Sequence, residues 1–361
     1  MSKAPDSDVA NDARGAVRLR RPERMQVVMR MECDDDLKTP LTIWCNAHYA
    51  EPAMEELRRG IAPHTLIQPD VRGPSNLIAA SADPLLAKAD IALGQPDADQ
   101  VIHLPRLKWV HLTTAGYTRY DTETFRAAMK SRGAILTNSS MVYDEPCAEH
   151  VLSMMLAISR QLPQCWSDQA STRPWRAAEH RIRCHLLENQ TALLLGFGAI
   201  ARRLVELLQP FRMNLIAVRR TVTGKEPIRT VPFSRIDELI PQADHIVNIL
   251  PSNPSTDGLF NAKLIRLMKP TAMFYNIGRG PTVDQAALQN ALERNAIAGA
   301  YLDVTDPEPL PPDHPLWKLP NCWITPHTAG GHADEFERII RHFLDNLRRF
   351  EAGDPLLDRI V

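Results

Sequence analysis

The chain has 361 residues, 44% of them hydrophobic, and a formal net charge of −1 at pH 7. This length is typical of two domains, and the hydrophobic content is enough for a core in each. A nearly neutral chain has no general attraction for nucleic acid or anionic membranes, so we expect neither as a partner. The six cysteines form no Cys-x-x-Cys pair, which argues against a zinc site or a disulfide framework, and we expect no metal.

Residues 1–38 are polar and charged, and we expect a flexible arm there, although Met25–Met31 could pair as an edge strand. The first residues lack the apolar core of a signal peptide and include acidic side chains, unlike a transit peptide. No run approaches 18 apolar residues, so no membrane span is expected. Together with the scattered cysteines, these features indicate a cytoplasmic protein.

From residue 39 to residue 159 the sequence alternates apolar strands with helical segments, which predicts one parallel α/β domain. The predicted strands are Thr42–Cys45, Thr65–Gln68, Asp90–Leu93, Leu107–Leu112 and Ile135–Thr137, and the predicted helices are Pro52–Arg59 and Pro146–Ser159. Ligands of such sheets bind at the carboxyl ends of the strands. The small-residue loop Thr113–Gly116 lies at such an end.

The stretch from residue 192 to residue 220 has the most specific pattern. Ala192–Leu195 is an uninterrupted apolar run, as expected of a parallel strand buried on both faces. A glycine turn follows at once, then apolar residues at helical spacing until Pro210, and then a second apolar strand, Leu215–Val218. Such a unit presents free helix N–H groups to the pyrophosphate of a dinucleotide.

The glycine turn itself is Gly196-Phe197-Gly198-Ala199-Ile200-Ala201. Gly196 permits the tight turn, Gly198 lets a phosphate approach the backbone, and Ala201 stands in for the third glycine. We therefore expect the turn to bind a dinucleotide.

A basic pair, Arg219 and Arg220, ends the second strand, and Thr221 follows it. An NAD-binding unit usually carries an acidic residue here, which accepts the ribose 2′-OH and would repel a 2′-phosphate. A guanidinium binds that phosphate through charge-assisted hydrogen bonds. The sequence therefore predicts NADP(H), with NAD(H) possible.

The alternation of strands and helices resumes after the basic pair. The predicted strands are Ile246–Leu250, Ala272–Tyr275, Ala298–Leu302 and Cys322–Thr325, and the predicted helices are Phe260–Met268, Asp284–Arg294 and a terminal helix at 332–350. The terminal helix is expected to return to the first domain.

Three loops after these strands carry candidate catalytic residues: Arg279, Glu308 and His327. Parallel strands end at one edge of a sheet, so these side chains could meet beside the cofactor. Histidine suits proton transfer near neutral pH, and a neighbouring carboxylate would orient its ring. A permanently charged arginine can bind a substrate carboxylate or polarise a carbonyl. The set suits reduction of a 2-oxo acid.

Together these motifs resemble the D-isomer-specific 2-hydroxyacid dehydrogenases over roughly residues 85–345. The glycine turn, Asn276–Gly280, Asp303–Leu310 and Thr325–His327 match in order and approximate spacing. The resemblance implies an α/β fold of two Rossmann-like, doubly wound parallel-sheet domains, with the cofactor domain inserted into the substrate domain. The implied division is an arm at 1–38, a substrate domain at 39–147, a cofactor domain at 148–327 and a returning segment at 328–361.

The resemblance also assigns roles to residues. Arg279, Glu308 and His327 correspond to the catalytic set, Asp303 would contact the nicotinamide carboxamide, and the amides of Ala115 and Gly116 would hold the substrate carboxylate. The expected cofactor contacts are Gly196, Phe197, Gly198, Ala199, Ile200, Arg219, Arg220, Thr221, Leu250, Pro251, Thr256, Ile277, Gly278, Asp303, His327 and Gly330. The expected substrate contacts are Thr114, Ala115, Gly116 and Arg279.

The implied activity is NADP(H)-dependent reduction of a small 2-oxo acid to the D-2-hydroxy acid, as in the glyoxylate/hydroxypyruvate reductases. The sequence does not name the acid, because selectivity depends on pocket shape near Tyr117, Arg119 and Tyr143. An NAD(H)-binding sensor, like the C-terminal-binding-protein corepressors, stays open, although the basic pair argues against it. A formate or phosphite dehydrogenase is a second alternative, and Glu308 disfavours only the formate enzyme.

Two further features bear on assembly and local geometry. The helix Pro146–Ser159 and the segment 160–190, with Trp166 and Trp175, exceed what one crossover connection needs. The corresponding region forms the dimer contact in the family, so we expect a two-fold homodimer. Before the glycine turn, the segment 188–191 lacks the glycine usual in the family, which leaves its geometry open.

Overall fold

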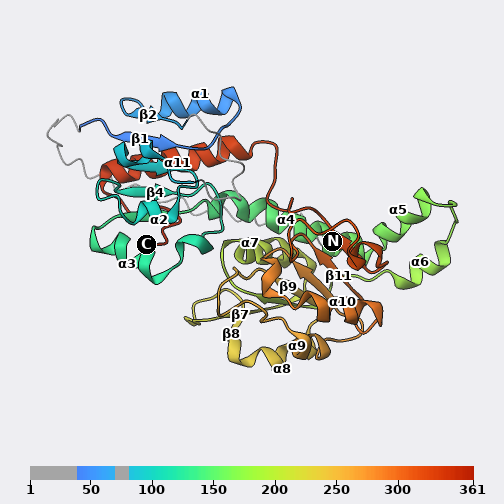
Figure 1. The fold of residues 1–361 in the computed structure, drawn as a ribbon. Helices are drawn as coiled ribbons and strands as arrows, with labels where there is room; N and C mark the ends of the chain where they lie inside the picture. The colour runs from blue at the N-terminus through green and yellow to red at the C-terminus, as the bar shows by residue number, and fades with distance from the viewer. Residues whose placement is uncertain (1–38, 70–80) are drawn as a thin grey trace, which may run out of the picture. The chain divides into compact units, whose positions relative to one another are not determined.

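The computed structural model describes residues 39–69 and 81–361, which form two parallel sheets (Figure 1). The expected arm at 1–38 and its alternative strand Met25–Met31 lie outside the described residues.

The first sheet has five strands in the order β2-β1-β3-β4-β5, and all its pairings are parallel. The strands are β1 (Thr42–Cys45), β2 (Thr65–Ile67), β3 (Ile91–Leu93), β4 (Trp109–His111) and β5 (Ile135–Thr137), with helices α1 (Glu51–Gly60), α2 (Ala98–Val101) and α3 (Glu123–Ser131). Neighbouring residues of a strand face opposite sides: Ile43 packs in one core and Trp44 in another.

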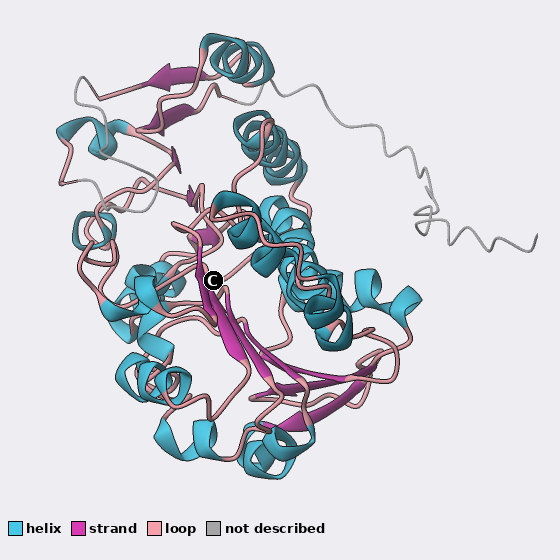
Figure 2. Cartoon of the chain, turned by 90° about the vertical axis from the view of Figure 1, so that its right-hand side faces the viewer, coloured by secondary structure: helices cyan, strands magenta, loops and turns pink. Residues whose placement is uncertain are grey.

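The second sheet has seven strands in the order β12-β11-β10-β9-β6-β7-β8, again parallel throughout. The strands are β6 (Thr191–Leu195), β7 (Asn214–Arg219), β8 (Arg229–Pro232), β9 (His245–Asn248), β10 (Met273–Asn276), β11 (Gly299–Leu302) and β12 (Cys322–Ile324). The helices are α7 (Ala199–Leu208), α8 (Ile236–Leu239), α9 (Ala262–Arg266) and α10 (Gln285–Glu293). Figure 2 shows helices on both faces of this sheet. The strand order reverses between β6 and β9, where doubly wound sheets bind ligands.

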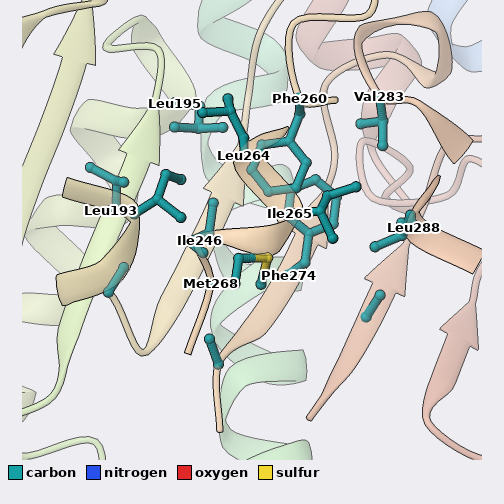
Figure 3. Close-up of a cluster of buried hydrophobic side chains, with 14 of the residues drawn as sticks. Leu193, Leu195, Ile246, Phe260, Leu264, Ile265, Met268, Phe274, Val283 and Leu288 are labelled. Atoms are coloured by element: carbon teal, nitrogen blue, oxygen red, sulfur yellow. The ribbon is translucent and has the colours of Figure 1, made fainter. Parts of the chain in front are cut away.

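Strand β6 is buried on both faces, which explains its uninterrupted apolar sequence. Leu193 and Leu195 pack in one core, while Ala192 and Leu194 pack in the core on the other face. The first core is drawn in Figure 3, where Phe260 and Phe274 stack with ring centroids 4.3 Å apart. Packed cores on both faces fix where β6 ends and the glycine turn begins.

Three helices lie between the two sheets in the sequence, and one follows the second sheet. They are α4 (Ser140–Ser159), α5 (Leu162–Ala170), α6 (Ala177–Arg183) and α11 (Glu335–Ala352). Helix α11 returns to the first sheet, because its Ile339 and Phe343 pack in the same core as Ile43 and Leu57. The predicted fold class, with the cofactor domain inserted into the substrate domain, is confirmed.

The start of α4 differs from the sequence-based prediction. The helix begins at Ser140, so Pro146 lies inside it rather than in the first turn. A proline removes one backbone donor from a helix. Burial of Val142 before the proline and of Cys147 and Ala148 after it outweighs that loss.

The short edge strand β8 and the helices α2, α3, α5, α6 and α8 were not predicted from the sequence. The approach to the glycine turn was left open, and Asn189 resolves its geometry. This residue has φ +65°, in the left-handed region that asparagine enters more readily than most residues, so it takes the role of the missing glycine. Among the described residues, no helix is both long and apolar enough to cross a membrane.

Candidate active site

The glycine turn joins β6 to α7 with the geometry that a dinucleotide site needs. Gly196 has φ +103°, and a Cβ there would lie 3.3 Å from the carbonyl oxygen of Ile249. Gly198 is the N-cap of α7 and supplies no side-chain acceptor, so the first helical N–H groups are not capped by it. Ala201 is fully buried against the sheet, which explains why a small residue stands at the third position. The turn fits a pyrophosphate.

The end of β7 carries an ion pair that the sequence reasoning did not foresee. Nη1 of Arg219 lies 3.2 Å from Oε1 of Glu226, whose side chain is 3% exposed while that of Arg219 is 29% exposed. The Glu226 carboxylate also accepts hydrogen bonds from the backbone N–H and the hydroxyl of Thr223. The backbone N–H of Thr223 is the main reason that the pKa of Glu226 falls to about 2. Arg220 and Thr221 are exposed beside this pair.

The loop after β9 contains the expected cofactor contacts Leu250, Pro251 and Thr256. The hydroxyl of Thr256 donates to the carbonyl of Pro251 at 2.6 Å, which closes the loop. A Cβ on Gly278 would lie 2.6 Å from the Leu250 carbonyl oxygen, so only glycine allows the two loops to touch.

Arg279 is held by a buried polar network at the end of β10. The side-chain amide of Asn248 donates to Asn276 at 2.9 Å and to the hydroxyl of Thr282 at 2.7 Å. Both Asn276 and Thr282 donate to the carbonyl of Arg279. Burial lowers the pKa of the guanidinium. An anionic substrate would relieve the cost of burying this charge.

Glu308 and His327 meet at the ends of β11 and β12. Oε1 of Glu308 is in hydrogen-bond contact with Nδ1 of His327. The Glu308 loop is fastened by Gln285, whose side chain bonds both the carbonyl and the N–H of Asp306. Because Nδ1 is engaged, Nε2 is the ring nitrogen left to act on a substrate.

The loop that carries His327 is ordered by Asp303. His327 has φ +53°, an unusual conformation for a residue other than glycine. The Asp303 side chain accepts hydrogen bonds from the backbone N–H of Thr328 at 2.9 Å and of Ala329 at 3.0 Å. Asp303 is only 3% exposed. Asp303 therefore fixes the chain on the carboxyl side of the histidine.

The catalytic candidates share a cavity of about 230 Å³ with the loop after β4. It is lined by Gln95, Thr114, Gly116, Thr118, Arg119, Arg279, Glu308 and His327. A Cβ on Gly116 would lie 2.3 Å from Nη2 of Arg279, so the guanidinium lies directly against the Gly116 backbone. Gln95 and Thr118 were not predicted because they carry no motif, whereas Arg119 was predicted to lie near the substrate pocket.

An adjoining cavity of about 220 Å³ contains most of the expected nicotinamide side of the site. Its lining includes Ala115, Ile200, Ile277, Asp303 and Gly330 from the predicted set, and Tyr143, Cys147, Ala329, Gly331 and Glu335 in addition. Four residues line both cavities: Thr114, Gly116, Arg279 and His327. The other predicted cofactor residues line neither cavity; among them, Arg219 ends β7, and Arg220 and Thr221 follow it. In the described ranges, no three His, Cys, Asp or Glu residues are grouped to hold a metal.

Comparison with known proteins identifies the family. Residues 152–329 match the model of the D-isomer specific 2-hydroxyacid dehydrogenase NAD binding domain. The human glyoxylate reductase/hydroxypyruvate reductase is 35% identical over 237 residues, which cover 63% of this chain and 70% of that protein. The chain belongs to the D-isomer-specific 2-hydroxyacid dehydrogenase family. It is therefore an oxidoreductase.

Other members agree over more of the chain. Glyoxylate/hydroxypyruvate reductase B of Pectobacterium carotovorum is 31% identical over 277 residues, 75% of this chain and 85% of that protein. A Rhizobium etli structure, solved with NADP, HEPES and L(+)-tartaric acid, has a TM-score of 0.72 and 25% identity. The matched region covers 89% of this chain and 98% of the Rhizobium etli chain. The similarity thus extends across both sheets.

Proposed function

We propose that this protein uses NADP(H) to reduce a small 2-oxo acid, of the glyoxylate or hydroxypyruvate type, to the D-2-hydroxy acid. The observation that carries the proposal is the meeting of Arg279, Glu308 and His327 in one cavity, beside the loop at Gly116. The similarity to the human glyoxylate reductase/hydroxypyruvate reductase and to the Pectobacterium glyoxylate/hydroxypyruvate reductase B supports the substrate class.

The geometry supports a division of labour among the three side chains. Arg279 binds the substrate carboxylate against the Gly116 backbone. His327 donates a proton from Nε2 to the carbonyl oxygen, and Glu308 holds its ring through Nδ1. NADPH, when bound at the glycine turn, supplies the hydride. The proposed cofactor and substrate contacts are those expected from the sequence, with Gln95, Thr118 and Arg119 added at the substrate end.

NADP(H) is the proposed cofactor because Arg219 and Arg220 stand where an NAD-binding unit carries an acidic residue. The Rhizobium etli structure holds NADP, which supports this choice. Glu226 is acidic and nearby, but at 3% exposure its carboxylate faces Arg219 rather than solvent. NAD(H) remains the alternative cofactor.

A panel of 2-oxo acids tests the proposed function. Purified protein is mixed with glyoxylate, hydroxypyruvate, pyruvate or a branched 2-oxo acid, with NADPH or NADH, and cofactor oxidation is followed. We expect turnover of at least one acid, faster with NADPH, and a D-configured product from any acid other than glyoxylate, whose product has no stereocentre. Cofactor binding without turnover of any of these acids would contradict the proposed reaction and favour one of the alternatives, the corepressor-like sensor or the phosphite or formate dehydrogenase.

We propose that the protein acts as a homodimer. None of the residues of α5 or α6 is buried, and Trp166, Trp175 and Ile182 are 57%, 95% and 82% exposed. Figure 1 shows both helices projecting beside the second sheet. Exposed apolar side chains on unburied helices suit a surface covered by a second copy. Light scattering should give twice 40.5 kDa, and Ile182→Glu should weaken the dimer, whereas Val222→Glu should not.

Two lesser assignments accompany these proposals. We keep the domain division at 147 and 327, although α4 runs through the first boundary as one helix. We also propose a cytoplasmic location, which the five unbonded cysteines in the described ranges support.

A further inference from the structure

We propose that Tyr301 is a positioning residue for the catalytic loop, acting through Thr325 and Asp303. The inference rests on the proposed role of His327 as proton donor. A partly buried series of hydrogen bonds begins on α4, crosses β11 and ends beside His327.

The series ends at the Asp303 carboxylate, which already accepts the backbone N–H groups of Thr328 and Ala329. The hydroxyl of Thr325 donates to Oδ1 of Asp303 at 2.6 Å. This bond engages Oδ1, the same carboxylate oxygen that accepts the backbone N–H of Thr328. The orientation of Asp303, and with it the left-handed turn at His327, therefore depends on Thr325.

The series continues to Tyr301 and His150. The Tyr301 hydroxyl lies 2.5 Å from Oγ1 of Thr325 and 2.6 Å from Nε2 of His150. Since Thr325 uses its only proton toward Asp303, its oxygen must accept from Tyr301. Tyr301 then accepts from His150, which carries its proton on Nε2. Every bond thus points toward Asp303.

Tyr301 suits this role because its hydroxyl does not readily lose its proton. Burial raises its pKa well above the ordinary value, so the hydroxyl remains a donor at any working pH. Tyr301 is 0% exposed and packs in the core on one face of the second sheet. A phenol held by packing on one side and by two hydrogen bonds on the other is a rigid support for Thr325.

Two pairs of variants separate positioning from simple loss of stability. Thr325→Val keeps the shape of the side chain but removes the hydroxyl donor, whereas Thr325→Ser keeps the hydroxyl donor. Tyr301→Phe is matched by Tyr275→Phe, because Tyr275 is its register partner on β10 and is equally buried. The Tyr275 hydroxyl bonds His245 at 3.0 Å and leaves the catalytic loop untouched. Both tyrosine variants therefore lose one buried hydroxyl.

Hydrogen exchange of the segment 326–331 and steady-state kinetics provide the readouts. We expect faster exchange in Tyr301→Phe and Thr325→Val, and wild-type exchange in Tyr275→Phe and Thr325→Ser. The kcat of the first two should fall about 10-fold or more, with KM for the 2-oxo acid little changed, because the displaced loop carries the proton donor but not Arg279. If Tyr301→Phe does not fold, the Thr325 pair decides.

The proposal is overturned if Thr325→Val and Tyr301→Phe exchange and turn over like their matched controls. Failure of the proposed function is a separate result, because wild-type protein without turnover still allows the exchange comparison. Faster exchange without any wild-type turnover would support the hydrogen-bond series and refute the reductase.

Discussion

Arg219 on β7 is paired with Glu226, a carboxylate from the following loop, at 3.2 Å. The acidic side chain faces inward, while the guanidinium keeps partial access to solvent. The chain therefore carries its own anion beside the position proposed for the 2′-phosphate. Because Glu226 engages Nη1, the other guanidinium nitrogens of Arg219 remain for a ligand.

The cofactor preference should depend on Arg219. Arg219→Asp replaces a donor with a carboxylate that repels a 2′-phosphate and accepts a 2′-OH. Hydrogen bonds to charged groups contribute about 1.5–3 kcal/mol, so the NADPH/NADH ratio of kcat/KM should fall at least about tenfold. The measurement is made at low salt, since screening weakens the contrast. Arg212→Asp, which breaks a pair with Glu188 away from the site, is the control. An unchanged ratio would refute the assignment.

The Glu226 interactions should appear in the acid stability of the protein. The pKa of Glu226 falls from 4.5 to about 2, chiefly through the N–H of Thr223, so its stabilisation is present above pH 4.5. It is lost as the pH falls from 4.5 to about 2. Glu226→Gln removes this contribution. Urea unfolding at several pH values should show a shallower acid loss of stability in the variant than in the wild type, and equal slopes would contradict the assignment.

His327 should be essential for turnover but not for cofactor binding. Replacing a general acid commonly costs about 10²-fold or more in rate, so His327→Gln should lower kcat by at least that factor. NADPH affinity, measured by fluorescence titration, should stay within a few-fold of wild type. Near-normal turnover of the variant would mean that another group donates the proton.

Glu308 should hold the His327 ring in place for proton transfer. Its Oε1 is in hydrogen-bond contact with Nδ1 of His327, so loss of the carboxylate frees the ring. Glu308→Ala should therefore lower kcat about 10-fold or more, with NADPH affinity within a few-fold of wild type, because a misplaced acid costs rate. An unchanged kcat would show that this contact does not orient the ring.

Asn189 should tolerate glycine and resist alanine. Its φ of +65° costs a residue with an ordinary Cβ about 1–2 kcal/mol, whereas glycine adopts it freely. Asn189→Ala should therefore lower the free energy of unfolding by roughly that amount, and Asn189→Gly should be close to neutral. Equal stability of the two variants would contradict the conformation.

Periodicity and motifs were sufficient to predict the fold and the grouping of Arg279, Glu308 and His327 in one cavity. The apolar run Ala192–Leu195 indicates a strand that is buried on both faces. Arg279, Glu308 and His327 each follow a predicted parallel strand, which indicates that they lie at the same edge of the sheet. Both features are local sequence patterns, so a single sequence is enough to recognise them.

The features missed by sequence reasoning depend on tertiary contacts. Glu226 pairs with Arg219 only because the loop after β7 folds back, and Gln95 reaches the site from the other domain. The predicted start of α4 was wrong because a proline inside a helix is rare unless burial compensates, and Pro146 was therefore placed in the first turn. No periodic pattern records such contacts.

Transfer of label from NADPH that carries deuterium at both C4 positions of the nicotinamide tests the central claim most directly. The protein is incubated with that cofactor and hydroxypyruvate or glyoxylate, and the product is analysed by mass spectrometry, with chiral analysis for the hydroxypyruvate product. We predict one deuterium on the carbon that was the carbonyl, a D-configured product from hydroxypyruvate, and about 10²-fold slower labelling by His327→Gln. Absence of label in the product of the wild type, with NADPH bound, would contradict the account.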